Sequence, residues 1–278
     1  MIEIRRSIEI SSVCDTSEIL NFINFIVKEK IKFMGIYVGT CGFSESMKRY
    51  FEEFSTIEIQ QTFYKIIDVK LLKKWRGMAK EDFIFNFKVF QGITHPFPSK
   101  TWKRSNIDVT KIKENVGHLK PTKEVLNFWK KMVEYANVLK SKVLVIQLPQ
   151  SFKSEDENWE NAEKFFKSIE RDNFEIGVEL RGWDEKDIKK FCKKFDVIDV
   201  CDLGVRLPTI FKEVSYFRLH GSYKDGRINY YHRYTNEELK EVLEKAKNLK
   251  SKDVFIYFNN VFMLDDSRKF INLLQTYQ

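Results

Sequence analysis

The sequence is poor in cysteine and histidine, and it has no long apolar run. Its 278 residues include four of each of these two types. The cysteines form no CxxC pair and no metal-like spacing with histidine, which predicts reduced thiols in a cytoplasmic protein. The histidines show no HxH or HExxH spacing, which argues against a dedicated metal site. No stretch approaches the roughly 20 apolar residues of a membrane span, and the charged N-terminus does not resemble a signal peptide.

The chain is basic, with a formal net charge of +8 from 48 Lys and Arg against 40 Asp and Glu. This balance suits an anionic ligand or nucleic acid as partner. The lysines are dispersed rather than clustered, however, so a solubilising surface explains most of the excess. Hydrophobic residues make up 43% of the chain and include 25 Phe, which is enough for a large core.

Strand-like and helix-like segments alternate from Ile36 onward, which is typical of parallel β/α architecture. The predicted strands span residues 36–38, 56–60, 83–89, 143–148, 174–181, 197–201, 216–221 and 253–258. We therefore expect a single (β/α)8 TIM barrel in a domain of residues 34–278. An open doubly wound sheet is the alternative, and the lack of a GxGxxG motif after the first strand disfavours it.

Two segments lie outside this alternation. Residues 1–33 read as an N-terminal extension, in which Thr16 would cap a helix, and we expect the barrel to fold without it. Residues 91–121 form a long irregular stretch. A loop of this length in a compact domain is usually a lid, a binding loop or a disordered insert.

Polar side chains recur where the predicted strands end. Side chains alternate along a strand, so Arg218 and His220 share one face, while Phe217 and Leu219 share the other. In a TIM barrel the carboxyl ends of the strands converge on one mouth, where active sites lie. The residues expected at or beside this mouth are Thr40, Glu58, Gln60, Tyr64, Lys88, His95, Gln147, Glu179, Arg181, Trp183, Asp202, Arg218, His220, Gly221 and Asn259.

Four of these residues, Glu58, Lys88, Glu179 and His220, are candidates for catalysis. The two glutamates would form an acid/base or glycosidase pair, or else partner buried cations. Lys88 would be a base or a Schiff-base amine, or else an ion-pair partner. His220 is the best candidate for proton transfer, and a purely structural imidazole is its alternative. His95 would contact substrate or be an ordinary loop residue.

No cofactor is predicted. A magnesium ion held by Glu58, Glu179 and Asp202 stays open, because carboxylates suit this ion. Cys41 stands beside the mouth, where a buried inert thiol is favoured over a nucleophile.

Seven short motifs, in chain order, resemble those of one family. They lie at residues 39–43, 58–64, 87–95, 147–152, 178–183, 217–221 and 257–260. Together they resemble the YecE-like family, domain of unknown function 72. The resemblance implies a TIM barrel of unsettled activity, with suggested relationships to sugar isomerases and AP endonucleases. The family usually has Ser where Cys41 stands, so a thiol is not required chemistry.

Three functions fit these observations. The first is an enzyme for a small anionic or sugar-phosphate-like substrate, with Lys88, Arg181 and Arg218 as a clamp and the two glutamates and His220 as acid/base groups. The second is a nucleic-acid-processing enzyme of the AP endonuclease kind. The histidine-rich metal site of that class is missing from this sequence. The third is a non-catalytic binding protein for an anionic ligand. Reaction and oligomeric state are not predicted.

The strand ends also predict where an anion binds. Loops after the seventh and eighth barrel strands often hold phosphate, and here they begin at Gly221 and Asn259. Glycine lets a backbone N–H approach an oxyanion, and arginine bonds two oxygens at once. We expect phosphate or sulfate there, with Arg218 or Arg181 in reach. Alternatively, the buried glutamates engage both arginines fully.

Overall fold

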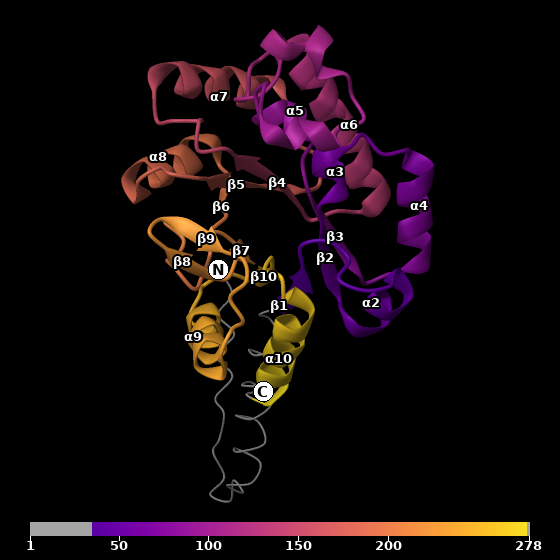
Figure 1. The fold of residues 1–278 in the computed structure, drawn as a ribbon, viewed down its shortest axis with the longest axis vertical. Coiled ribbons are helices and arrows are strands. Elements are labelled where there is room, and N and C mark those ends of the chain that lie inside the picture. Colours follow the sequence, from indigo (N-terminus) through magenta and orange to yellow (C-terminus); the bar gives the residue numbers. More distant parts are fainter. Residues whose placement is uncertain (1–34, 277–278) are drawn as a thin grey trace, which may run out of the picture. The chain divides into compact units, whose positions relative to one another are not determined.

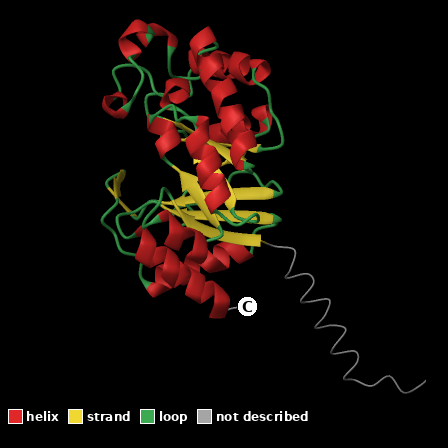
Figure 2. Ribbon diagram, turned by 90° about the vertical axis from the view of Figure 1, so that its right-hand side faces the viewer, coloured by secondary structure: helices red, strands yellow, loops and turns green. Residues whose placement is uncertain are grey.

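The computed structural model describes residues 35–276, so the expected extension of residues 1–33 lies outside it. Residues 36–278 form one compact unit, in which the strands lie at the centre and the helices outside (Figure 2). All eight predicted barrel strands are present. They are β1 (Gly35–Thr40), β2 (Thr56–Ile59), β3 (Ile84–Lys88), β4 (Val143–Leu148), β5 (Glu175–Leu180), β6 (Ile198–Asp199), β7 (Val214–Leu219) and β10 (Asp253–Phe258).

The strands form two sheets that meet at two junctions. One sheet has the order β2-β3-β4-β5-β6 and the other β1-β10-β7. Isolated parallel bridges join Cys41 to Glu58 and Cys201 to Phe217. A backbone hydrogen bond supports each junction, since Gly42 N donates to Glu58 O (2.8 Å) and Arg218 N to Cys201 O (2.9 Å). The strand order therefore follows a (β/α)8 barrel whose ladders are interrupted at these two places.

Helices follow the strands in the predicted order (Figure 1). They are α2 (Met47–Glu53), α3 (Gln61–Tyr64), α4 (Val69–Met78), α5 (Gln91–Thr94), α6 (Lys123–Leu139), α7 (Asp156–Ser168), α8 (Glu185–Phe195), α9 (Asn236–Lys247) and α10 (Met263–Thr276). Side chains cap two of the helix starts: Asp68 accepts a hydrogen bond from Lys70 N, and Thr235 and Glu238 close a capping box, which satisfies free N–H groups there. Within residues 35–276 no helix is long and apolar enough to cross a membrane.

The irregular stretch of residues 91–121 packs closely against the barrel. It contains α5 and three short 3₁₀ turns, Lys100–Arg104, Val109–Lys111 and Lys113–Asn115. Val116 and Leu119 are fully buried, and the Trp102 indole donates to the carbonyl of His95 at 3.1 Å. Burial of these side chains holds the segment at the mouth of the barrel, as a binding loop requires.

The barrel interior is apolar at one end and polar at the other. One cluster of buried interior residues includes Ile84, Val143, Val145, Tyr216 and Phe255. Because side chains alternate, the next residues on the same strand faces are polar, and they stand toward the carboxyl ends. The apolar layer therefore forms a dry base beneath the charged groups.

One element was not predicted. A hairpin of β8 (Ser222–Lys224) and β9 (Arg227–Asn229) follows β7 and pairs antiparallel. Its turn places Asp225 and Gly226 at positive φ, 50° and 71°. An Asp-Gly pair favours such a turn, so the signal was present in the sequence.

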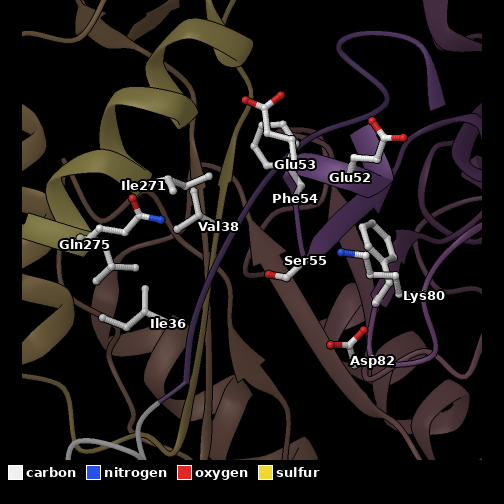
Figure 3. Close-up of a pocket in the computed structure, with 12 residues that line it drawn as sticks. Ile36, Val38, Glu52, Glu53, Phe54, Ser55, Lys80, Asp82, Ile271 and Gln275 are labelled. Carbon is white, nitrogen blue, oxygen red and sulfur yellow. The ribbon is translucent and has the colours of Figure 1, made fainter. Parts of the chain in front are cut away.

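A pocket of about 360 Å³ lies outside the strands beside the junction of β1 and β2. In Figure 3 Val38 and Ile271 stand on one side of it, with Phe54, Ser55 and Lys80 on the other. Ser55 and Lys80 precede β2 and β3, which places this pocket toward the amino ends of the strands. Active sites in this fold lie at the opposite, carboxyl ends of the strands. None of the predicted site residues lines this pocket.

Candidate functional site

A larger pocket, of about 740 Å³, opens at the carboxyl ends of β4 to β7. Strand ends, the 91–121 loop and the β8–β9 hairpin all contribute to it. The predicted site residues that line it are His95, Gln147, Glu179, Arg181, Trp183, Asp202 and His220. This volume is in the range of small-molecule sites.

Arg218 lies at the centre of a buried charge network beneath this pocket. Its Nε atom lies 3.1 Å from Glu58 Oε1, and its Nη1 atom lies 2.5 Å from Glu179 Oε2 and 3.3 Å from Gln147 Oε1. The Arg218 side chain is 1% exposed and that of Glu58 is fully buried. Burial opposes the charges, yet the two carboxylates raise the pKa of Arg218 well above its ordinary value. The donors of Arg218 bond to the acceptors of Glu58, Glu179 and Gln147, so this network is a structural ion cluster.

Three side chains besides Arg218 donate hydrogen bonds to the Glu58 carboxylate. Tyr216 Oη donates to Oε2 at 2.8 Å, and Cys41 Sγ donates to Oε1 at 3.3 Å. The Gln60 amide also donates to Oε1. Burial and the Glu58 carboxylate raise the pKa of the Cys41 thiol well above its usual range. The thiol is therefore protonated, as expected of an inert cysteine, and both carboxylate oxygens of Glu58 accept hydrogen bonds from side chains within the barrel.

Lys88, at the end of β3, has no carboxylate partner. Its Nζ atom lies 3.5 Å from the centroid of the Phe63 ring. Within residues 35–276 it forms no ion pair, although the residue is only 5% exposed. Burial lowers the pKa of Lys88 well below its usual range, and the nearby cations Arg218 and Arg181 lower it further. The ion-pair interpretation of this lysine is therefore wrong.

Arg181 and His220 meet at the pocket wall. Arg181 Nε donates to Glu179 Oε1 at 2.5 Å, while its Nη2 lies 3.4 Å from His220 Nε2. The Arg181 side chain is 27% exposed, so part of its guanidinium faces the pocket. Burial by itself would raise the pKa of Glu179. The charges of Arg181 and Arg218 outweigh this effect and hold the pKa well below its usual range. Glu179 is consequently a fixed carboxylate rather than an acid.

The second imidazole nitrogen of His220 faces Asp202. Nδ1 lies 3.4 Å from Asp202 Oδ2 but has no hydrogen-bond partner in the described part of the chain. The backbone N–H of His220 donates to the same carboxylate oxygen at 2.9 Å. Because a guanidinium only donates, Nε2 is the acceptor toward Arg181 and the neutral ring carries its proton on Nδ1. His220 therefore presents its basic nitrogen beside an arginine.

His95 is a buried part of the pocket and not a surface loop residue. Burial is the main reason that its pKa falls to about 3, and the nearby Arg181 cation contributes to the same shift. Nδ1 is 2.7 Å from Thr94 Oγ1. The ring also packs edge-on against Phe63 at 4.9 Å. At neutral pH His95 is thus an uncharged hydrogen-bonding group.

Other predicted residues point elsewhere. Thr40 does not face the pocket: its hydroxyl lies 3.0 Å from Tyr50 Oη on α2, because Thr40 falls on the outer face of β1. The Tyr64 ring is covered by the Arg104 guanidinium at 3.5 Å. These contacts contradict the prediction that Thr40 lies at the mouth.

The backbone donor at the expected anion site of Gly221 and Asn259 already has a partner. The backbone N–H of Gly221 donates to Tyr234 Oη at 2.8 Å, so it is not available to an oxyanion. Asn259 does not line the mouth pocket. The charge network already engages Arg218. Arg181 also lines the pocket, and its side chain is 27% exposed there.

The magnesium arrangement does not form in this structure. Over residues 35–276 no three His, Cys, Asp or Glu side chains gather as metal ligands. Arg218 stands between Glu58 and Glu179, and Asp202 is turned toward His220. These carboxylates therefore have cationic or N–H partners in place of an ion.

Sequence reasoning missed several pocket residues. Ser99 and Thr101 come from the 91–121 loop, Arg206 comes from the loop after β6, and Arg227 comes from β9 of the hairpin that was not predicted. Arg206 is already engaged, since its Nη2 atom lies 2.7 Å from Asp199 Oδ1. No periodic pattern marks such loop residues.

Comparison with known proteins now places the chain. The profile of the family described as "Protein of unknown function DUF72" matches residues 32–278. This chain belongs to the DUF72 family. The resemblance to the YecE-like family, domain of unknown function 72, is thereby confirmed. No curated protein sequence matches the chain.

Solved structures of DUF72 proteins share the fold. One from Enterococcus faecalis V583 has a TM-score of 0.62 at 19% identity, covering 87% of this chain and 98% of its own. One from Thermotoga maritima MSB8 has a TM-score of 0.58 at 22% identity, with coverage of 87% and 99%. A D-psicose 3-epimerase, solved in the presence of D-fructose, has a TM-score of 0.51 at 10% identity, with coverage of 86% and 95%. At these identities the likeness shows the TIM-barrel-like fold alone.

Proposed function

We propose that this DUF72 protein is an enzyme that acts on a small, anionic, sugar-like substrate in the mouth pocket. The observation that carries the proposal is the pair of Arg181 and His220. An arginine with donors free toward a pocket of about 740 Å³ stands 3.4 Å from an imidazole nitrogen. An anion receptor beside a proton-transfer group is a minimal arrangement for acid/base chemistry on a charged metabolite.

The chemistry follows from what each group is free to do. The anionic group of the substrate takes the free donors of Arg181, which weakens the hold of Arg181 on His220 Nε2. That nitrogen then accepts a proton from the substrate, and Asp202 stabilises the imidazolium from the Nδ1 side, in the manner of a base and its orienting carboxylate. His95 stays neutral and offers a hydrogen bond from the opposite wall.

Two alternatives have their own signatures. A nucleic-acid-processing enzyme of the AP endonuclease kind would use the net charge of +8, and it would cleave abasic DNA with a dependence on added divalent metal. A non-catalytic binding protein would bind sugar phosphates without turning them over. The likeness to a D-psicose 3-epimerase supports the shared barrel scaffold and leaves the reaction to experiment.

The test compares ligand-induced melting shifts for wild type, Arg181→Gln and a control variant, Arg268→Gln. Arg268 pairs with Glu53 on α2, outside the mouth pocket. Inorganic phosphate and a panel of sugar phosphates are titrated, and hits are assayed for turnover by mass spectrometry and NMR. We expect stabilisation of wild type and Arg268→Gln and at least a tenfold weaker response of Arg181→Gln, which corresponds to about 1.4 kcal/mol. Equal shifts for all three proteins would overturn the proposed anion site.

A further inference from the structure

We propose that Lys88 is a covalent catalytic residue that forms an iminium ion with an aldehyde or ketone substrate. This inference rests on the proposed function, and it narrows the substrate class to sugars and related compounds that present a free carbonyl.

The charge count of the site leaves Lys88 without a counter-ion. Glu58 and Glu179 carry two negative charges, and Arg218 and Arg181 carry two positive charges in direct contact with them. Among the described residues, these four groups act most strongly on the charge of Lys88, and His95 shares the Phe63 ring with it. A protonated Lys88 would add an uncompensated positive charge in a buried place, so the neutral amine is the favoured form. A neutral amine is the nucleophilic form of lysine.

The surroundings of the Nζ atom fit this role. The Phe63 ring beneath it is 1% exposed and offers a dry floor. His95 packs on the same ring and also lines the mouth pocket. Lys88 itself is not among the residues that line the pocket: its Nζ atom lies one aromatic ring behind His95, at the carboxyl end of β3, where this fold places reacting groups.

The step balances with groups that are present. The Lys88 nitrogen lone pair attacks the carbonyl carbon, and the carbonyl oxygen takes a proton to give a carbinolamine. His220, once protonated, supplies the proton that lets the hydroxyl leave as water, and the C=N bond forms as the C–O bond breaks. The products are the iminium ion and one water, from carbonyl, amine and one proton. The iminium ion restores the positive charge that the neutral amine avoids, and this electron-poor nitrogen acidifies the neighbouring C–H for removal by a base.

Reductive trapping tests this proposal. The protein is incubated at pH 7 with glycolaldehyde, and separately with D-glyceraldehyde 3-phosphate, in the presence of sodium cyanoborohydride. Peptide mapping by mass spectrometry then gives the adduct at each lysine. We expect labelling of Lys88 to exceed that of the other lysines by at least about tenfold, because one unit of pKa changes the neutral fraction tenfold.

Lys142 is the matched control. It also lies over an aromatic ring, that of Tyr37 at 5.5 Å, but it pairs with Asp253 at 3.2 Å. Lys88→Met should abolish the dominant adduct, while Lys142→Met should leave it unchanged. The site distribution in wild type is informative even where Lys88→Met folds poorly. Labelling of Lys88 no greater than that of Lys142 would overturn the proposal.

The two probes separate this inference from the proposed function. Glycolaldehyde tests the amine alone, whereas the phosphate of D-glyceraldehyde 3-phosphate also needs Arg181. Strong Lys88 labelling by both, without any advantage from phosphate, would support the covalent role and contradict the anion site. Phosphate binding at Arg181 without an adduct at Lys88 would support the anion site and contradict the covalent role.

Discussion

The Nε atom of Arg218 lies 3.1 Å from Oε1 of Glu58, and neither side chain is more than 1% exposed. Arg218 also pairs with Glu179. Both ion pairs give Arg218 a structural role beneath the mouth pocket rather than a role in binding a ligand. The same contacts surround Glu58 with donors deep in the barrel: Arg218, Tyr216 and Gln60 all donate to its carboxylate. The free donors are left to Arg181, one layer closer to solvent.

Arg218→Ala should destabilise the protein by about 3–5 kcal/mol, because removal of one partner leaves buried carboxylates uncompensated. Chemical denaturation at pH 7 measures this change. The surface variant Arg268→Ala, which breaks a half-exposed pair with Glu53, should cost about 1 kcal/mol or less. Pairing Arg218→Met with Glu58→Gln should recover part of the loss. Similar, small effects of both single substitutions would contradict the framework role.

Lys88→Met should be more stable than wild type at pH 7, and the gain should shrink as the pH rises. Burial lowers the folded-state pKa of Lys88, whereas the unfolded chain has an ordinary lysine pKa of about 10.4. Between the two values the unfolded state binds one more proton, so wild-type stability rises with pH through that window. Methionine removes this proton uptake.

The measurement is the difference in unfolding free energy between wild type and Lys88→Met at several pH values from 7 to above 10. Subtraction cancels the titration of other groups. Lys142→Met is again the control, since Lys142 is half-exposed and pairs with Asp253. A variant that is less stable than wild type by a constant amount at every pH would show that Lys88 is protonated in the folded protein.

Gly39→Ala and Gly77→Ala should change stability in opposite directions. A Cβ atom at Gly39 would lie 2.4 Å from the carbonyl oxygen of Thr56, where β1 approaches β2, whereas a Cβ atom at Gly77 in α4 meets nothing within 4 Å. Overpacking at Gly39 should cost about 1–3 kcal/mol. The helical alanine should add about 0.5–1 kcal/mol. Thermal melts of both variants decide this, and a harmless Gly39→Ala would show that the junction of β1 and β2 is loose.

The sequence predicted the fold well because its signals were local. Alternating side chains defined the eight barrel strands, and capping residues such as Asp68 and Thr235 marked helix starts at the observed places. Strand parity also predicted that Glu179, Arg218 and His220 would share the barrel interior. Thr40 was expected at the mouth because it ends its strand, but its side chain faces outward and lies against Tyr50 on α2.

The distribution of hydrogen bonds could not be predicted. Nothing local shows that Tyr234 accepts the N–H of Gly221 from 13 positions away, or that Arg218 reaches Glu58 across the barrel. Those long-range contacts decide which groups remain free for a ligand. They move the expected anion site from Gly221 and Arg218 to Arg181.

The most direct test of the account is to locate a bound anion in crystals grown or soaked with selenate, a phosphate-like ion with an anomalous signal. The account predicts a selenium peak within hydrogen-bond distance of Arg181 in the mouth pocket, close to His220, and its loss in Arg181→Gln crystals. A peak at Gly221 and Asn259, or ions confined to surface lysines, would contradict it.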